Sequence, residues 1–263
     1  MNPADPIGIF DSGVGGLSVL RAARAQLLQE NFIYFADSGY APYGDKSDAY
    51  VTERSERIGA WLIEQGVKAI VVACNTATAV ALQALRNNFT LPIVGVEPGL
   101  KPAIGATKSG KVGVLATVRT LASERYTALL ARVKTDAPKI EFMDRIGKGW
   151  VEAVERGEFE SSQTIDMVER VVTPLLAEGC DTLVLGCTHY PFLAAAIQSA
   201  APRATIIDTA PAIARELARR IRSEGALNGA QTRGSLRIAT TGDAVRMSAL
   251  VATMLREKPR RKK

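Results

Sequence analysis

The strongest indication of architecture is the segment LLAEGCDTLVLGCTH (175–189), whose pattern is repeated by LIEQGVKAIVVACNT (62–76). In each segment a helical pattern ends at a glycine, a run of aliphatic residues follows, and a cysteine comes directly after the run. This order is typical of a helix that leads into a buried strand. The aligned pairs, all 113 residues apart, are Gly66 with Gly179, Cys74 with Cys187, and Thr76 with His189. We therefore predict two related lobes, each with one thiol at the end of a strand.

The rest of the chain alternates between short apolar runs and helical patterns. The runs that predict buried strands are IGIF (7–10), FIYFA (32–36), AIVVA (69–73), PIVGV (92–96), KVGVLA (111–116), TLVLG (182–186), TIIDT (205–209) and LRIAT (236–240). The helical patterns include residues 17–28, 55–65, 161–178 and 211–221. Such alternation predicts an α/β fold with parallel strands. We expect two pseudo-symmetric lobes, each a mostly parallel sheet flanked by helices, with an active site between them at the carboxyl ends of the strands.

Composition excludes several classes of protein. The 263 residues are 47% hydrophobic, but no apolar run approaches the roughly 20 residues of a membrane span. The N-terminus lacks the layout of a signal peptide, so we expect a cytoplasmic protein without a membrane partner. Of the net charge of +6, the basic tail REKPRRKK (256–263) carries +5. The remainder of the chain is therefore nearly neutral, and a nucleic-acid partner is not favoured.

Three cysteines in a chain of this length do not form a disulfide framework. A lone cysteine at a strand end is most often a small core residue, and we interpret Cys180 in this way. The matched positions of Cys74 and Cys187 favour chemistry instead. A thiol on each side of a bound carbon could remove a proton from one face and return one to the other. Zinc held by the two cysteines and the only histidine, His189, is an alternative, although no metal-binding spacing accompanies them.

Polar residues follow the predicted strands and complete the candidate site. Asp11 ends the first strand in IFDSGVGG, where its carboxylate could relay a thiol proton or could simply cap the following turn. Ser12 and the glycines after it offer backbone N–H groups to an anion. Further short polar residues follow the two cysteines and could hold a zwitterion: Asn75, Thr76, Thr188 and His189.

Five motifs in this order closely resemble those of the glutamate racemase family. They are IGIFDSGVGGLSVL (7–20), ADSGYAPYG (36–44), VVACNTATA (71–79), VGVEPG (94–99) and LVLGCTHYP (183–191). The resemblance covers nearly the whole chain. It implies interconversion of L- and D-glutamate in the bacterial cytosol to supply peptidoglycan synthesis, with no cofactor, whether pyridoxal phosphate or metal. An aspartate racemase is the alternative by substrate. A two-lobed amino-acid-binding protein and a single-thiol decarboxylase or hydrolase are alternatives of other classes.

The resemblance also implies roles for individual residues. Cys74 and Cys187 look like the acid–base thiols for D- and L-glutamate respectively, with Asp11 assisting Cys74 and His189 assisting Cys187. Glu155 in WVEAVERGE stands where the family has a glutamate that contacts this histidine. The implied substrate contacts are Asp11, Ser12, Tyr43, Gly44, Asn75, Thr76, Thr117, Thr120, Thr188 and His189. At Thr117 and Thr120 the chain departs from the family pattern, because Arg119 stands where a glycine is usual.

The family's chain passes from one lobe to the other and back. By similarity, residues 1–97 and 210–263 would form the first lobe and residues 98–209 the second. The resemblance also implies a homodimer.

Overall fold

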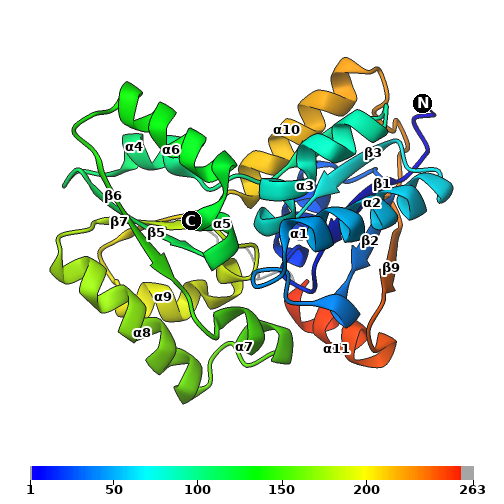
Figure 1. Cartoon of the computed structure of the whole chain (residues 1–263). Coiled ribbons are helices and arrows are strands. Elements are labelled where there is room, and N and C mark those ends of the chain that lie inside the picture. The colour runs from blue at the N-terminus through cyan, green and yellow to red at the C-terminus, as the bar shows by residue number, and fades with distance from the viewer. Residues whose placement is uncertain (1, 256–263) are drawn as a thin grey trace.

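The structure is a computed structural model that describes residues 2–255, and it contains two separate parallel sheets (Figure 1). The five-stranded sheet has the order β4-β3-β1-β2-β9, with β1 Ile7–Asp11, β2 Phe32–Ala36, β3 Ala69–Val72, β4 Ile93–Gly95 and β9 Leu236–Thr240. The four-stranded sheet has the order β6-β5-β7-β8, with β5 Lys111–Ala116, β6 Glu141–Ile146, β7 Thr182–Leu185 and β8 Thr205–Ile207. Every paired strand is parallel. The predicted α/β class with two parallel sheets is confirmed.

Helices cover both faces of each sheet (Figure 1). In the first lobe they are α1 Leu17–Gln26, the short helix η1 Ser38–Tyr40, α2 Asp48–Glu64, α3 Asn75–Asn88, α10 Ala210–Ser223 and α11 Ala244–Met254. In the second they are α4 Leu100–Ala106, α5 Val118–Ala122, α6 Glu124–Asp136, α7 Trp150–Arg156, α8 Ser162–Ala177, η2 Tyr190–Leu193 and α9 Ala194–Ala200. The chain enters the second sheet after β4 and returns to the first after β8. Lobe boundaries at 97/98 and 209/210 stay a prediction.

The two sheets repeat one strand order. The series β4-β3-β1-β2 corresponds to β8-β7-β5-β6, and β9 extends the first sheet alone. The helix before each thiol-bearing strand ends near a glycine with positive φ, +74° at Gly66 and +92° at Gly179. This left-handed conformation is one that L side chains rarely adopt, which explains why both segments share a glycine there. The repeat therefore places Cys74 and Cys187 after equivalent strands.

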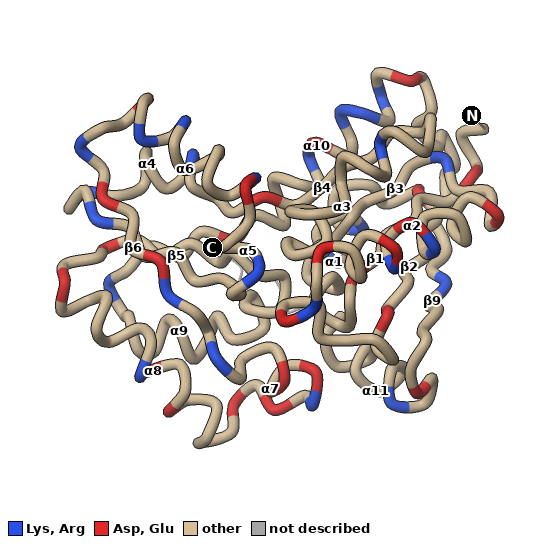
Figure 2. The backbone as a smooth tube through the Cα atoms, viewed as in Figure 1, with Lys and Arg blue, Asp and Glu red and all other residues tan. Residues whose placement is uncertain are grey.

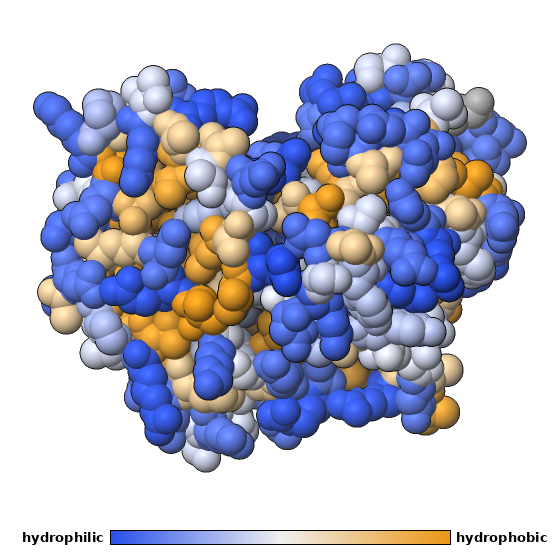
Figure 3. Space-filling view, in the orientation of Figure 1, coloured by the Kyte–Doolittle hydropathy of each residue, from blue (hydrophilic) through white to orange (hydrophobic). Residues whose placement is uncertain are grey.

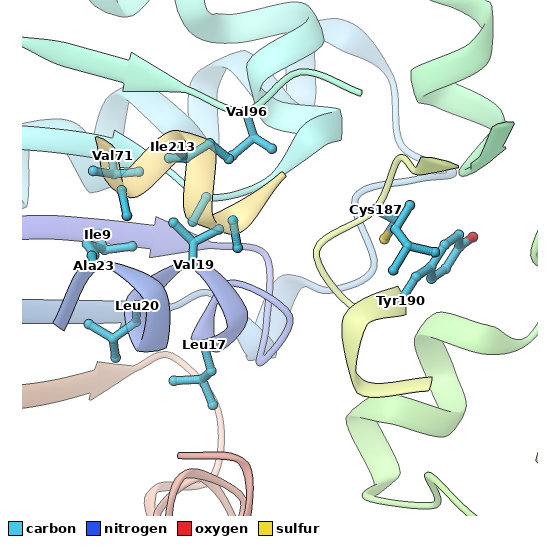
Figure 4. Close-up of a cluster of buried hydrophobic side chains, with 14 of the residues drawn as sticks. Ile9, Leu17, Val19, Leu20, Ala23, Val71, Val96, Cys187, Tyr190 and Ile213 are labelled. Atoms are coloured by element: carbon cyan, nitrogen blue, oxygen red, sulfur yellow. The ribbon is translucent and has the colours of Figure 1, made fainter. Parts of the chain in front are cut away.

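Alternation along the strands distributes side chains between layers. In β1, Ile7 and Ile9 pack on the α1–α10 side of the first sheet, whereas Phe10 packs on the α2–α3 side. The first of these layers continues into the second lobe, where it includes Cys187 and Tyr190 (Figure 4). Burial of apolar area on both faces of a sheet is the main stabilising contribution in such folds. The site is thus attached to the core of both lobes.

Strand β6 was not predicted from the sequence. Its residues EFMDRI carry three charges, and only Met143 is fully buried. Because β6 is an edge strand, it lacks the continuous apolar run that marks the central strands.

Charges of both signs are interspersed over the two lobes (Figure 2). Among residues 2–255, no helix is long and apolar enough to cross a membrane. The basic tail, on which the small expectation of nucleic-acid binding depends, lies outside the described residues.

Candidate active site

A cavity of about 270 Å³ lies between the lobes, where the carboxyl ends of the central strands of both sheets meet. The space-filling view shows the notch between the two lobes (Figure 3). Both Cys74 and Cys187 line this one cavity. The other sequence-predicted residues on its wall are Ser12, Tyr43, Gly44, Asn75, Thr76, Thr117, Thr188 and His189. Asp11, Thr120 and Glu155 do not line it. Two thiols from different lobes therefore share a single chamber.

Cys74 is the residue that precedes α3, and its sulfur accepts a hydrogen bond from the Ala77 N–H at 3.4 Å. The thiol lies 3.9 Å from Ser12 Oγ, to which it donates. Burial, and after it the negative charge of Asp11, raise the pKa of Cys74 well above that of an ordinary thiol. Cys74 is therefore a neutral thiol at neutral pH and can donate a proton.

Cys187 belongs to a different electrostatic environment. His189 Nδ1 lies 3.7 Å from its sulfur, and the other ring nitrogen, Nε2, lies 2.7 Å from Glu155 Oε1. Burial acts to lower the pKa of His189, but the hydrogen bonds to Cys187 and Glu155 outweigh it and raise that pKa well above its usual value. An imidazolium at this distance stabilises a thiolate on Cys187. The two thiols therefore lie in different electrostatic surroundings, with the Asp11 carboxyl group near Cys74 and a histidine cation beside Cys187.

Glu155 joins the two lobes as well as orienting the histidine. Its Oε1 atom accepts the Val14 N–H at 2.8 Å in addition to its contact with His189. Burial acts to raise the pKa of Glu155, but its hydrogen bonds to His189 and Val14 and the charge of His189 lower it overall. Glu155 is therefore a carboxylate at neutral pH, and it fixes the ring of His189 relative to the glycine loop of the first lobe.

Three N–H groups of the glycine loop, those of Gly13, Val14 and Gly16, are not available to an anion in the cavity. Asp11 Oδ2 accepts the N–H groups of Gly13 at 3.2 Å and Gly16 at 2.9 Å, while Glu155 accepts that of Val14. The protein's own carboxylates satisfy these donors because the loop folds back on Asp11 and abuts α7. The glycines instead allow close approach: a Cβ on Gly13 would lie 1.9 Å from Glu155 Oε1.

Gly15 likewise allows the ring of His189 to approach the loop closely. A Cβ there would lie 2.3 Å from His189 Nδ1, so Gly15→Ala must displace the ring. We expect about a 10²-fold loss of turnover, because displacement by about 1 Å misaligns the group beside Cys187. Gly105→Ala is the control, since a Cβ there meets nothing within 4 Å. Steady-state kinetics with equal activity in the two variants would show that the loop contact is dispensable.

Asp11 is fully buried beneath the cavity. Its Oδ2 atom caps the following loop, which is the alternative role that the sequence suggested for Asp11. Its Oδ1 atom has no hydrogen-bond partner among the described residues. Burial raises the pKa of Asp11, opposed by the charge of His189 and the backbone hydrogen bonds. The carboxyl group is therefore a better proton acceptor than an exposed aspartate, and its part in assisting Cys74 stays a prediction.

Tyr43 lines the cavity, and its hydroxyl donates a hydrogen bond to Asp37. Asp37 is fully buried and also accepts two hydrogen bonds from Arg54, at 2.9 and 2.7 Å, and one from Thr241 at 2.9 Å. Sequence reasoning missed this network, although Asp37 directly follows the buried strand β2, next to β1, which ends at Asp11. The network fixes the loop that carries Tyr43 and Gly44 at the cavity wall.

Thr117 and Thr120 were paired as substrate contacts, but they occupy different positions. Thr117 lines the cavity, where its hydroxyl lies 3.2 Å from Thr76 Oγ1 and 3.0 Å from Thr120 Oγ1. Thr120 is buried behind Thr117, and its N–H is capped by the Thr117 hydroxyl at 3.3 Å. Despite Arg119, this loop forms a regular capped helix start. Thr120 therefore supports Thr117 from behind.

One wall of the cavity was missed entirely. It is the segment after β6, which contributes Ile146, Gly147, Lys148, Gly149, Val151 and Glu152. Candidate site residues were sought after predicted strands. Because β6 was not predicted, the loop at its carboxyl end was not considered. Cys180 lies away from the cavity and contacts Met143 at 3.6 Å, in keeping with a core residue. Within the described part of the chain, no group of three or more His, Cys, Asp or Glu residues is arranged to hold a metal ion.

Two thiols from different, pseudo-symmetric α/β lobes line one cavity, which is the arrangement expected of a cofactor-independent amino-acid racemase. Comparison with known proteins agrees with this class. A model of the Asp/Glu/hydantoin racemase family matches residues 18–217. The chain belongs to this family.

Within the family, the chain is similar to several glutamate racemases. The chain is 47% identical to the glutamate racemase of Ralstonia pickettii over 255 residues, which are 97% of this chain and 89% of that protein. It is 52% identical to the glutamate racemase of Methylococcus capsulatus over 223 residues, 84% of this chain and 81% of that protein. The crystal structure of glutamate racemase from Thermus thermophilus in complex with β-chloro-D-alanine superposes with a TM-score of 0.81 at 37% identity, covering 98% and 95% of the two chains.

Proposed function

We propose that the protein interconverts L- and D-glutamate by proton transfer at the α-carbon between two thiols, Cys187 and Cys74. The observation that carries this proposal is that the two sulfurs come from different lobes and line the same cavity. A substrate held between the lobes presents opposite faces of its α-carbon to them. The product D-glutamate would supply peptidoglycan synthesis.

The two thiols would exchange roles between the two directions of the reaction. In the conversion of L-glutamate, Cys187, beside the His189 imidazolium, acts as the base that removes the α-proton, and the electron pair stays on the α-carbon as a carbanion. Cys74, the neutral thiol, then donates a proton to the opposite face, which gives D-glutamate. After one turnover Cys187 is a thiol and Cys74 a thiolate, the state that D-glutamate requires. Asp11, with its raised pKa, would share the proton of Cys74 during that exchange.

The carbanion needs electrostatic stabilisation, because a thiolate is far too weak a base to deprotonate an amino acid in water. Asn75 Oδ1 is buried and has no hydrogen-bond partner within residues 2–255, which suits it to accept a hydrogen bond from the substrate ammonium. Hydroxyl groups of Ser12, Thr76, Thr117 and Thr188 line the same cavity and can donate to the carboxylates. Donors fixed before substrate arrives cost no reorganisation as negative charge develops.

Optical activity tests the proposal directly. The purified protein should abolish the circular dichroism of L-glutamate, and of D-glutamate, by conversion to an equal mixture. Aspartate is the rival substrate, and a faster loss of its signal would assign the protein to aspartate instead. Retained signal from both amino acids would contradict a racemase.

Glu155→Gln should move the alkaline side of the pH–rate profile to lower pH. The Glu155 carboxylate helps to raise the pKa of His189, so its loss lowers that pKa toward the ordinary value of about 6.5. Activity falls as pH rises through the pKa of His189, because the imidazolium beside Cys187 is lost. Measurement of kcat/KM against pH for both proteins checks this, and an unchanged or upward-shifted alkaline limb would contradict the assigned charge of His189.

We also propose that residues 1–97 with 210–263 and residues 98–209 form the two lobes, and that the protein is a cytoplasmic homodimer. The division follows the change of sheet along the chain, and the other two statements depend on the family resemblance. Sedimentation of the purified protein tests the dimer.

A further inference from the structure

An ion pair joins the two lobes beside the cavity. Arg119 Nη1, on α5 of the second lobe, lies 2.9 Å from Asp48 Oδ1, in the first turn of α2 of the first lobe. Each partner closely follows residues that line the cavity: Arg119 comes directly after Thr117 and Val118, and Asp48 comes three residues after Asp45. The pair therefore connects two loops of the cavity wall, one from each lobe.

The walls are already in contact at this point. Thr117 Oγ1 lies 3.2 Å from Thr76 Oγ1, and a Cβ on Gly44 would lie 3.4 Å from the Thr117 Cβ. These contacts join the two lobes on the α5 side of the cavity, as the Glu155–Val14 hydrogen bond joins them on the α7 side. They are uncharged contacts between short side chains, whereas the ion pair spans the same junction with the long side chain of Arg119. The ion pair can therefore persist at lobe separations at which the shorter contacts would be broken.

We propose that Arg119 and Asp48 form an interlobe clasp and that Arg119 is a positioning residue for the racemase site. The proposal rests on the proposed function. Without the clasp, the lobes would spend less time at the spacing that binds substrate, and apparent affinity falls with the fraction of competent protein. Once substrate is bound it bridges both walls itself, so turnover should be unaffected. The clasp therefore acts on KM and leaves kcat unchanged.

The size of the effect follows from exposure. The side chains of Arg119 and Asp48 are 31% and 66% exposed, so solvent and salt screen the pair. We expect Arg119→Met to raise KM for both enantiomers about threefold, in line with the energy of exposed ion pairs. Arg119→Lys should restore most of the affinity because it keeps the charge. Added salt should narrow the difference between the wild-type protein and Arg119→Met.

The experiment is a double-mutant cycle on the full chain. KM and kcat are measured for wild type, Arg119→Met, Asp48→Asn and the double variant, with Arg57→Met as control. Arg57 forms an exposed pair with Glu53, 2.6 Å apart, within α2, the helix that carries Asp48, but that pair does not cross the lobes. The clasp predicts that the double variant has no higher KM than Arg119→Met alone, and that Arg57→Met resembles wild type.

The possible outcomes separate the two proposals. Additive effects of the two substitutions, or a KM for Arg119→Met equal to that of Arg57→Met, would overturn the clasp while leaving the racemase intact. A fall in kcat at unchanged KM would likewise overturn it. Absence of racemisation by the wild-type protein would instead refute the proposed function.

Discussion

Replacement of either Cys74 or Cys187 by serine is expected to lower kcat for racemisation by about 10⁴-fold, the upper range for loss of a general acid or base. A serine hydroxyl occupies nearly the same space as the thiol but is a far weaker acid. It cannot alternate between its charged and neutral forms near neutral pH. Each enantiomer needs one thiol as base and the other as acid, so either substitution should stop both directions. Circular dichroism of L- and D-glutamate solutions measures the loss.

Cys180→Ser is the matched control for this experiment. Cys180 is as buried as the other two cysteines, at 5% exposure against 5% and 6%, but it contacts Met143 outside the cavity. We expect this variant to keep near wild-type turnover. Full activity in Cys74→Ser or Cys187→Ser would remove that thiol from the mechanism.

His189→Asn should reduce kcat about 10³-fold. The substitution removes the cation that lies 3.7 Å from the Cys187 sulfur and breaks the contact with Glu155. Cys187 would then have to ionise in a buried site without a positive partner, which is unfavourable. Asparagine keeps a polar side chain of similar length, so the loop after β7 should still fold. Kinetics at several pH values, together with the unfolding midpoint, separates loss of chemistry from loss of structure.

A variant that folds normally and retains more than about a tenth of wild-type turnover would show that His189 is not needed to charge Cys187. The expected residual activity should rise with pH, because hydroxide can ionise the thiol when the imidazolium cannot assist.

The repeated segments predicted the central architecture because both lobes bury the same kind of strand. Their constant spacing aligns β3 with β7, and their two glycines both adopt positive φ. Strand β6 could not be found in the same way. Its charged, half-exposed sequence reflects an edge position that only the assembled sheet defines. For the same reason, the cavity wall formed by the segment after β6 was not predicted.

Residue identities in the site were easier to predict than hydrogen-bond partners. Both cysteines, His189 and most of the short polar residues line the cavity. However, the hydroxyl of Tyr43 donates to Asp37, and the N–H groups of the glycine loop bond to Asp11 and Glu155. These partners lie up to 141 residues away along the chain. Each donor has several nearby acceptors, and the choice among them depends on how each loop folds within its lobe and, for Val14, on the packing of one lobe against the other.

Conversion of D-glutamate in heavy water tests the facing arrangement of the thiols most directly. With a separate acid on the far side of the α-carbon, the first L-glutamate formed should carry deuterium at that carbon, while unreacted D-glutamate should keep its original hydrogen. Deuterium appearing in both pools at equal rates, or product that retains the original hydrogen, would mean that a single group works on both faces. Neither result can be reconciled with Cys74 and Cys187 acting from opposite lobes.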